Sequence, residues 1–419
     1  MVIISLIISL FSIELDTQIN GSGFGIWEWI FSNEPEGARA VLSTIAGSMM
    51  TVAGVTFSMT LISISFASSQ IGPRVLSNFM SDRGNQVTLG TFISTFVFCL
   101  LVLRTVKGSS DTGENVAFVP HISILIAIIF AILSIAVLIY FMHHIPQSIS
   151  MTEAVDKIGD QLRKSINRLY PKQIGDSQKK VKGINDILKD YSQENFIIAQ
   201  GKGYIEYINS DFLFECCHRN DLIVEILKRP GDFVSQKIKI AKVYSKDKLD
   251  DELLVELRNA LIWGVKRSYK QDILFPGELL VEIAARALSP GVNDPYTAIE
   301  CLNQLQDGMI ALMGKDIPSP YRYDENDYLR IIARPLDFRE FYNEIFDSMR
   351  GYVKRDYLCT KWSLELFRTL AQTDDKKRYF KEIEEQSCAL VQSFKNNTDD
   401  KKDIEQIVAV LDEIKKTGQ

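Results

Sequence analysis

The sequence predicts a multi-span α-helical membrane protein with a cytoplasmic α+β domain, in which a small β-barrel-like module precedes helices. Three observations support this fold class. Nearly all the long apolar runs lie before residue 143, whereas nearly all the charge follows it. Short runs rich in β-branched and aromatic residues then occupy 195–245, and helical patterns fill the remainder. With 419 residues, the chain is long enough for two or three domains.

Three segments are apolar enough to cross a membrane. The clearest is 122–142, ISILIAIIFAILSIAVLIYFM, which has no charged residue and would extend about 31 Å as a helix. A second, 87–106, carries Arg104 near its end, where a long side chain can reach the interface. The third, 40–69, is longer than a bilayer requires, so we expect it to tilt or protrude.

The N-terminal segment 1–15 is apolar but short. Its run before Glu14 would extend only about 20 Å as a helix, and it lacks the basic region and cleavage site of a signal peptide. We interpret it as the outer part of a first transmembrane helix. Residues 1–142 are therefore expected to form a transmembrane domain of three to four helices.

The charges that flank these segments predict their orientation. Segment 14–39 holds five acidic residues against Arg39 alone, whereas basic residues follow the 40–69 and 122–142 segments. These basic residues are Arg74, Arg83, Lys157, Arg163 and Lys164. Basic loops stay in the cytoplasm, so we expect a multi-pass protein with both termini cytoplasmic.

Small and hydroxyl-bearing residues recur on one face of the 40–69 segment. We call this face the polar stripe, and it consists of Ser43, Gly47, Thr51, Gly54, Ser58 and Ser65. It is typical either of close packing between helices or of one wall of a water-filled path in an oligomer. Because the segment contains no charged residue, it favours a passive pore over a coupled pump.

The 40–69 segment is followed by a break at Gly72-Pro73, since proline can occupy the first turn of a new helix. An interfacial elbow is the simplest interpretation. Gly72, Pro73 and Arg74 are also candidates for a hinge or gate.

Beyond the membrane, the pattern divides the chain into three parts. Residues 143–194 read as a membrane-proximal helical linker with an amphipathic helix over 151–169. Residues 195–249 form the β-rich module, for which a compact barrel or sandwich is expected. Residues 250–419 read as helices, beginning with DELLVELRNALIWGVKRS.

The stretch RALSPGVNDPYTAIECL, residues 286–302, reads first as a tight corner between two helices. Asp294 is expected to cap the second helix, with Pro295 at its first position. Ser289, Asn293, Asp294 and Thr297 are candidates for a ligand loop at the same corner. No hydrolase, P-loop or zinc-protease motif accompanies them, so we expect no enzymatic activity and no catalytic residues.

The net charge and the cysteine pattern limit which partners and cofactors we expect. A net charge of −6 argues against nucleic acid as a partner. Six cysteines show no regular framework, and Cys216-Cys217-His218 lacks the partner motif of a metal site. We therefore expect buried cysteines, no metal and no cofactor.

Several long stretches resemble one bacterial family over nearly the whole chain and in the same order. They are GVTFSMTLISISFASSQIGPRVLSNFMSDRGNQVTLGTFISTFVFCLLVLRTV, GYIEYIN, RPGDFV and RSYKQDILFPGELLVEIAARALSPGVNDPYTAIECL. The sequence thereby resembles the predicted membrane proteins catalogued as domain of unknown function 2254. The resemblance implies a multi-span protein of the bacterial inner membrane with a cytoplasmic domain, and it implies no activity.

Together these patterns predict a homo-oligomeric membrane ion channel or small-solute pore with a cytoplasmic regulatory domain. Its partners would be membrane lipid, further copies of the chain, and ions or small solutes. The alternative is a non-conducting membrane sensor or scaffold whose cytoplasmic domain binds a ligand or partner.

Overall fold

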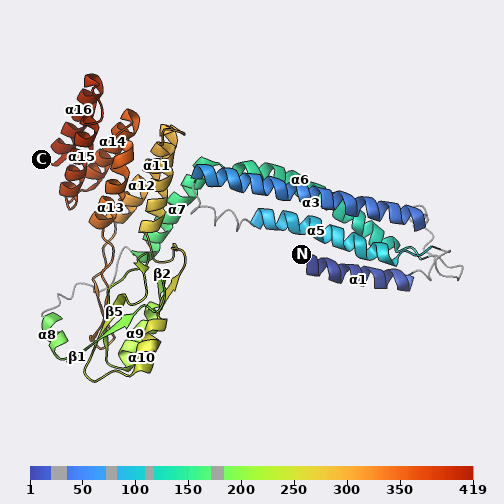
Figure 1. The fold of residues 1–419 in the computed structure, drawn as a ribbon, viewed down its shortest axis with the longest axis horizontal. Coiled ribbons are helices and arrows are strands. Elements are labelled where there is room, and N and C mark those ends of the chain that lie inside the picture. Colours follow the sequence, from blue (N-terminus) through green and yellow to red (C-terminus); the bar gives the residue numbers. More distant parts are fainter. Residues whose placement is uncertain (20–34, 72–82, 109–117, 149, 171–183, 419) are drawn as a thin grey trace. The chain divides into compact units, whose positions relative to one another are not determined.

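The computed structural model describes residues 1–19, 35–71, 83–108, 118–148, 150–170 and 184–418 (Figure 1). The chain divides into two compact units, Met1–Glu153 and Ala154–Gln419. We call them the membrane unit and the second unit.

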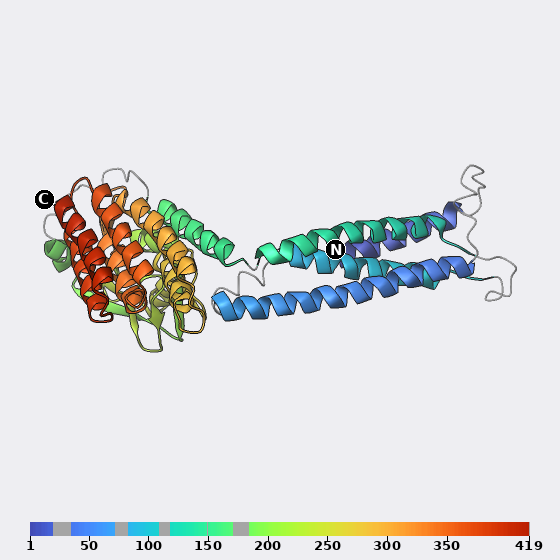
Figure 2. The same cartoon turned by 90° about the horizontal axis from the view of Figure 1, so that it is seen from above.

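The membrane unit is built from helices α1 (Val2–Ile19), α3 (Pro35–Ile71), α5 (Arg83–Thr105) and α6 (His121–Ser148). Within it, α3, α5 and α6 pack along one another (Figure 2). Among the described residues, three helices are long and apolar enough to cross a membrane: Pro35–Ser65, Arg83–Thr105 and His121–His144. The three clearest predicted spans are thus confirmed as candidate spans. Helix α1 packs against α5 and α6 and continues past the predicted end at residue 15.

The four helices alternate in direction. The Arg39 guanidinium, at the start of α3, donates to the carbonyl of Val106 just after α5, over 3.1 Å. Asp16, near the end of α1, accepts hydrogen bonds from the backbone at the start of α6. Met1 therefore lies toward the same end of this unit as the end of α6. Which end faces the cytoplasm stays a prediction.

The second unit begins within α7 (Met151–Leu169), which confirms the amphipathic helix predicted over 151–169. Its apolar face packs on α12 (Pro295–Met313), where Gly308 lies directly under Leu162. A Cβ at Gly308 would lie only 2.5 Å from that leucine, so the close approach requires glycine. The Arg163 guanidinium also pairs with Asp307 at 2.7 Å.

Two open sheets replace the barrel-like module that the sequence predicted for 195–249. One has the strand order β1-β5-β3-β8-β7 and the other β4-β2-β6. The strands are β1 (Gln193–Ile198), β2 (Gly203–Ile208), β3 (Ile223–Ile226), β4 (Phe233–Val234), β5 (Lys239–Ser245), β6 (Leu261–Gly264), β7 (Tyr321–Tyr323) and β8 (Leu329–Ile332). The barrel prediction was wrong because three of these strands come from beyond residue 249.

Part of the run read as a helix after residue 250 is extended instead. Helix α10 (Asp251–Asn259) ends before β6, whose residues pair antiparallel with β2. Another helix, α9 (Ser210–Arg219), interrupts the predicted strands and is capped by Asn209, whose side chain accepts from the Phe212 backbone at 3.2 Å. A partner strand distant in sequence overrides local helical periodicity in the first case.

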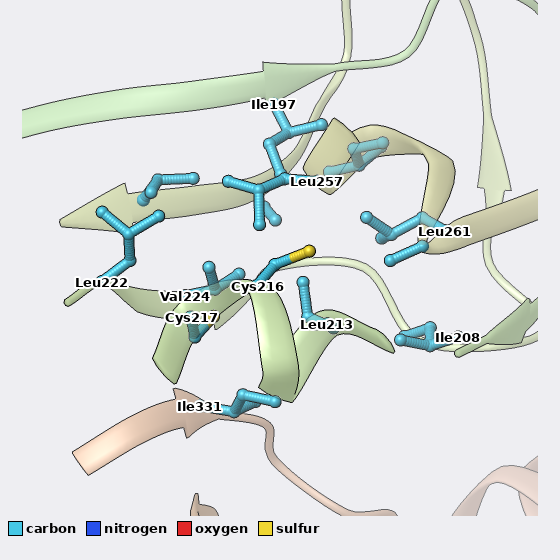
Figure 3. Close-up of a cluster of buried hydrophobic side chains, with 14 of the residues drawn as sticks. Ile197, Ile208, Leu213, Cys216, Cys217, Leu222, Val224, Leu257, Leu261 and Ile331 are labelled. Carbon is cyan, nitrogen blue, oxygen red and sulfur yellow. The ribbon is translucent and has the colours of Figure 1, made fainter. Parts of the chain in front are cut away.

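The sheets and α9 enclose one apolar core (Figure 3). Cys216 and Cys217 lie within it, beside Leu213 and Val224, which confirms the prediction of buried cysteines at this pair. Burial raises the pKa of the Cys217 thiol to about 12, so this thiol stays protonated at neutral pH.

The remaining helices lie side by side in Figures 1 and 2. They are α11 (Leu274–Ala287), α12, α13 (Phe338–Val353), α14 (Tyr357–Thr373), α15 (Phe380–Lys395) and α16 (Lys401–Gly418), and a short α8 (Ile184–Lys189) precedes β1. Fully buried aromatic rings join α13 to α14, with Phe346 and Phe367 at 4.5 Å between centroids.

Candidate functional site

All six residues of the polar stripe are exposed on α3. The helix instead turns Leu42, Ala46, Met49 and Ala53 toward its neighbours in the unit. A Cβ built on either stripe glycine would meet no atom within 4 Å. The stripe therefore takes no part in packing against the other described helices of the membrane unit.

Two of the stripe hydroxyls donate hydrogen bonds within α3. Thr51 donates to the carbonyl of Gly47 at 2.9 Å, and Ser58 donates to that of Gly54 at 3.0 Å. Such bonds to the carbonyl four residues earlier satisfy a hydroxyl without water. The hydroxyls of Thr51 and Ser58 therefore need no partner outside α3.

A second polar face, which the sequence reading missed, is buried on α1. It consists of Ser5, Ser9, Ser12 and Asp16, spaced so that all four point between α5 and α6. Asp16 accepts from the backbone of Ile122 at 2.9 Å and of Ser123 at 3.0 Å, and from the Ser123 hydroxyl at 2.6 Å. The carboxylate thus caps the start of α6 from a different helix.

The hinge candidates Gly72, Pro73 and Arg74 lie outside the described residues. The corner at 289–297 is described in full, and it confirms the predicted cap. Asp294 accepts from the Thr297 backbone at 3.2 Å and from its hydroxyl at 2.6 Å, with Pro295 in the first turn.

Backbone hydrogen bonds close the same corner on itself. The backbone N–H groups of Val292 and Asn293 both donate to the carbonyl of Ser289, and Asn293 adopts a φ of 51°. None of the four ligand-loop candidates lines the cavity that lies elsewhere in the second unit. Their role in ligand binding stays a prediction.

The second unit contains a cavity of about 590 Å³, which we call the inter-sheet cavity. Several chain segments line it, among them the end of α7, the start of α9, the β3–β4 turn, the loop before α11, the β7–β8 hairpin and helix α13. Its apolar wall includes Leu213, Ile226 and Ile331. This volume is in the range of small-molecule sites.

Four arginines line the inter-sheet cavity, and two of them belong to close ion pairs. The Arg229 guanidinium makes a two-pronged contact with Glu340, at 2.6 and 3.0 Å. Arg267 contacts Asp272 at 2.7 Å and also pairs with Glu278. Burial raises the pKa values of Asp272 and Glu278, although Arg267 opposes the shift in both cases.

Hydrogen bonds also hold the cavity's polar wall in place. Gln271 accepts from the backbone N–H of Ile208 and donates to its carbonyl, both at 2.9 Å. Asp272 accepts from the backbone of Leu274 and Phe275 at the start of α11. No cluster of metal-ligating side chains occurs among the described residues. The cavity offers arginine, carboxylate, amide and apolar groups to a ligand.

The sequence reading did not find this cavity. Two of its walls, RPGD at 229–232 and RSYKQD at 267–272, lie within stretches that carry the family resemblance. The charged and amide residues in these two stretches were the signal from which a binding site could have been predicted. Only folding brings them together with 318–344, because these segments are far apart in sequence.

Comparison with known proteins places this chain among predicted membrane proteins. A family model described as "Predicted membrane protein (DUF2254)" matches residues 1–386. An uncharacterized protein of Mycobacterium bovis is 30% identical over 356 residues, which cover 84% of this chain and 67% of that protein. Uncharacterized proteins from two strains of Mycobacterium tuberculosis match to the same extent. No solved structure matches.

Proposed function

The chain belongs to the DUF2254 family of predicted membrane proteins, and from that premise we propose that it is a homo-oligomeric ion channel or small-solute pore of the bacterial inner membrane. The polar stripe of α3 would line the path. The second unit would lie in the cytoplasm and regulate it.

The direction of the stripe is the observation that supports this proposal most. A line of hydroxyls and glycines on an apolar candidate span faces away from the other described helices of its own unit. Surfaces of this composition favour contact with another helix or with water over contact with lipid tails. Copies arranged around an axis with these stripes inward would form such a path.

Recordings from the purified full-length protein in planar bilayers under asymmetric KCl test this function. We expect discrete unitary currents, which Thr51→Trp abolishes because the indole fills the path at the middle of the stripe. Met59→Trp is the matched control, since Met59 is 45% exposed on α3 but lies outside the stripe. This control is expected to conduct.

The oligomeric state of each variant, measured by cross-linking in membranes, separates two roles of the stripe. Loss of current with the assembly intact supports a pore. Loss of the oligomer itself would show that the stripe serves to pack the copies of the chain against one another. Folded, oligomeric wild-type protein that never conducts would overturn the proposal.

The inter-sheet cavity favours a second candidate function, a non-conducting membrane sensor. Its volume and its arginine-rich wall suit the binding of a small molecule, whereas nothing in that unit requires a conducting path. A silent protein whose second unit binds a ligand would favour this alternative.

A further inference from the structure

Arg322, on strand β7, differs from the other half-buried arginines of the inter-sheet cavity because it has no carboxylate partner. Its Nη1 donates to the backbone carbonyls of Ser319 and Tyr321. In the described part of the chain no acidic side chain lies within 4 Å of its guanidinium. Burial lowers the pKa of this group, in keeping with a partly desolvated charge.

A desolvated guanidinium without a counter-charge is costly, and proteins normally supply one. The structure does so twice at the same cavity, where Glu340 pairs with Arg229, and both Asp272 and Glu278 pair with Arg267. Carbonyl oxygens satisfy part of the donor capacity of Arg322 but not its charge. The remaining guanidinium donors are available to a ligand.

Other charges at the cavity limit what such a ligand carries. Asp232 and Glu344 also line it, and within the described residues neither is in ion-pair distance of a basic side chain. Arg334 contributes little to the interior, because its side chain is 77% exposed. Asp232 and Glu344 repel an anionic ligand, and this repulsion grows with the number of negative charges on the ligand. A ligand with one negative charge, placed beside Arg322, is therefore favoured over a ligand with several.

We propose that the inter-sheet cavity binds a small monocarboxylate with an apolar body, whose carboxylate pairs with Arg322. Planar guanidinium and carboxylate groups match in two-pronged geometry. Leu213, Ile226 and Ile331 would receive the apolar body. The inference holds whether or not the membrane unit conducts, since every residue in it belongs to the second unit.

Isothermal titration calorimetry of the full-length protein in lipid nanodiscs tests the site, with 1-naphthoate as the probe and empty nanodiscs as the blank. We expect saturable binding of one probe per chain. Arg322→Met is expected to weaken it about ten- to hundredfold, the usual effect of losing a charge-assisted hydrogen bond. Arg322→Lys is expected to recover part of the affinity, because it keeps the charge.

Two controls distinguish binding at Arg322 from non-specific attraction of the probe to positive charge. Arg334→Met removes an arginine at the exposed rim of the same cavity and is expected to change the affinity by less than about twofold. The uncharged isostere 1-naphthamide is expected to bind as weakly to the wild type as 1-naphthoate binds to Arg322→Met. A loss with Arg322→Met counts only if its circular dichroism and melting temperature match those of Arg322→Lys.

Three results would overturn the proposal. They are the absence of saturable 1-naphthoate binding to folded wild-type protein, equal losses with Arg322→Met and Arg334→Met, and 1-naphthamide binding as tightly as 1-naphthoate. None of these results depends on the bilayer recordings, so the failure of the site is distinguishable from the failure of the pore.

Discussion

Arg229 and Glu340 join the β3–β4 turn to helix α13 through two parallel hydrogen bonds, from Nη2 at 2.6 Å and Nη1 at 3.0 Å. The two residues are separated by 111 positions in the chain. The pair therefore fastens the sheet region to the helices beside the inter-sheet cavity. Hydrogen bonding from Arg229 lowers the pKa of Glu340, so its carboxylate is charged at neutral pH.

A double-mutant cycle with Arg229→Ala and Glu340→Ala measures the coupling free energy between these two side chains. Both side chains are 34% exposed, which screens the interaction, so we expect a coupling free energy of about 1 kcal/mol. Denaturant unfolding followed by tryptophan fluorescence is the measurement. In the more exposed Arg163–Asp307 pair a single nitrogen, Nη1, donates to both carboxylate oxygens at 2.7 and 2.8 Å, and its coupling is expected to be smaller. Equal coupling in the two cycles would contradict the dependence on burial.

The pH dependence of stability is expected to involve Asp221. Hydrogen bonds from Lys246 and Arg330 lower its pKa to about 2, below the ordinary value of about 4. The unfolded chain therefore binds a proton more readily than the folded one between these values. The contribution of Asp221 to stability is present above about pH 4 and is lost as the pH falls toward 2.

Melting temperatures of the wild type and Asp221→Asn between pH 2 and pH 6 test this expectation. The difference between the two proteins should be largest at pH 5 to 6 and should shrink toward pH 2. A difference that stays constant across the range would show that Asp221 acts through packing or neutral hydrogen bonds instead.

Asp16→Ala is expected to destabilise the membrane unit. The substitution removes the acceptor of two backbone N–H groups and one hydroxyl at the start of α6. Loss of a helix cap lowers the free energy of unfolding by about 0.5–2 kcal/mol. Because Asp16 is buried, we expect its loss to lie toward the upper end of this range. The control is Glu14→Ala, an exposed carboxylate two residues earlier on α1. Similar resistance of both variants to thermal unfolding in detergent would exclude the capping role.

Asp294→Ala is expected to lower stability by about 1 kcal/mol through the lost cap of α12. Asp294→Ser keeps an acceptor at the cap and should lose only a few tenths of that amount. Thermal melting of the full-length variants is the measurement. An unchanged melting temperature, together with loss of stabilisation by an added ligand, would instead assign the corner to ligand binding.

Local sequence patterns predicted several elements closely. The 151–169 helix has the bounds that the 3–4 periodicity indicated, and the Asp294 cap forms with the predicted Pro295 at the first position. The three apolar spans were equally evident from composition. These features depend on residues within a few positions of one another, so the sequence by itself determined them.

Tertiary structure decided the features that depend on distant partners. Strand β6 forms because β2 pairs with it, although its residues continue a helical pattern. The stripe on α3 was visible in the sequence, but only the packing of Leu42 and Ala46 against the other helices showed that it faces outward. The inter-sheet cavity joins segments from residue 169 to residue 344, and its unpaired Arg322 is recognisable only beside the arginines that have partners. Whether a charged side chain is paired depends on the distance to the side chains that folding brings near it. The order of residues along the sequence does not contain that distance.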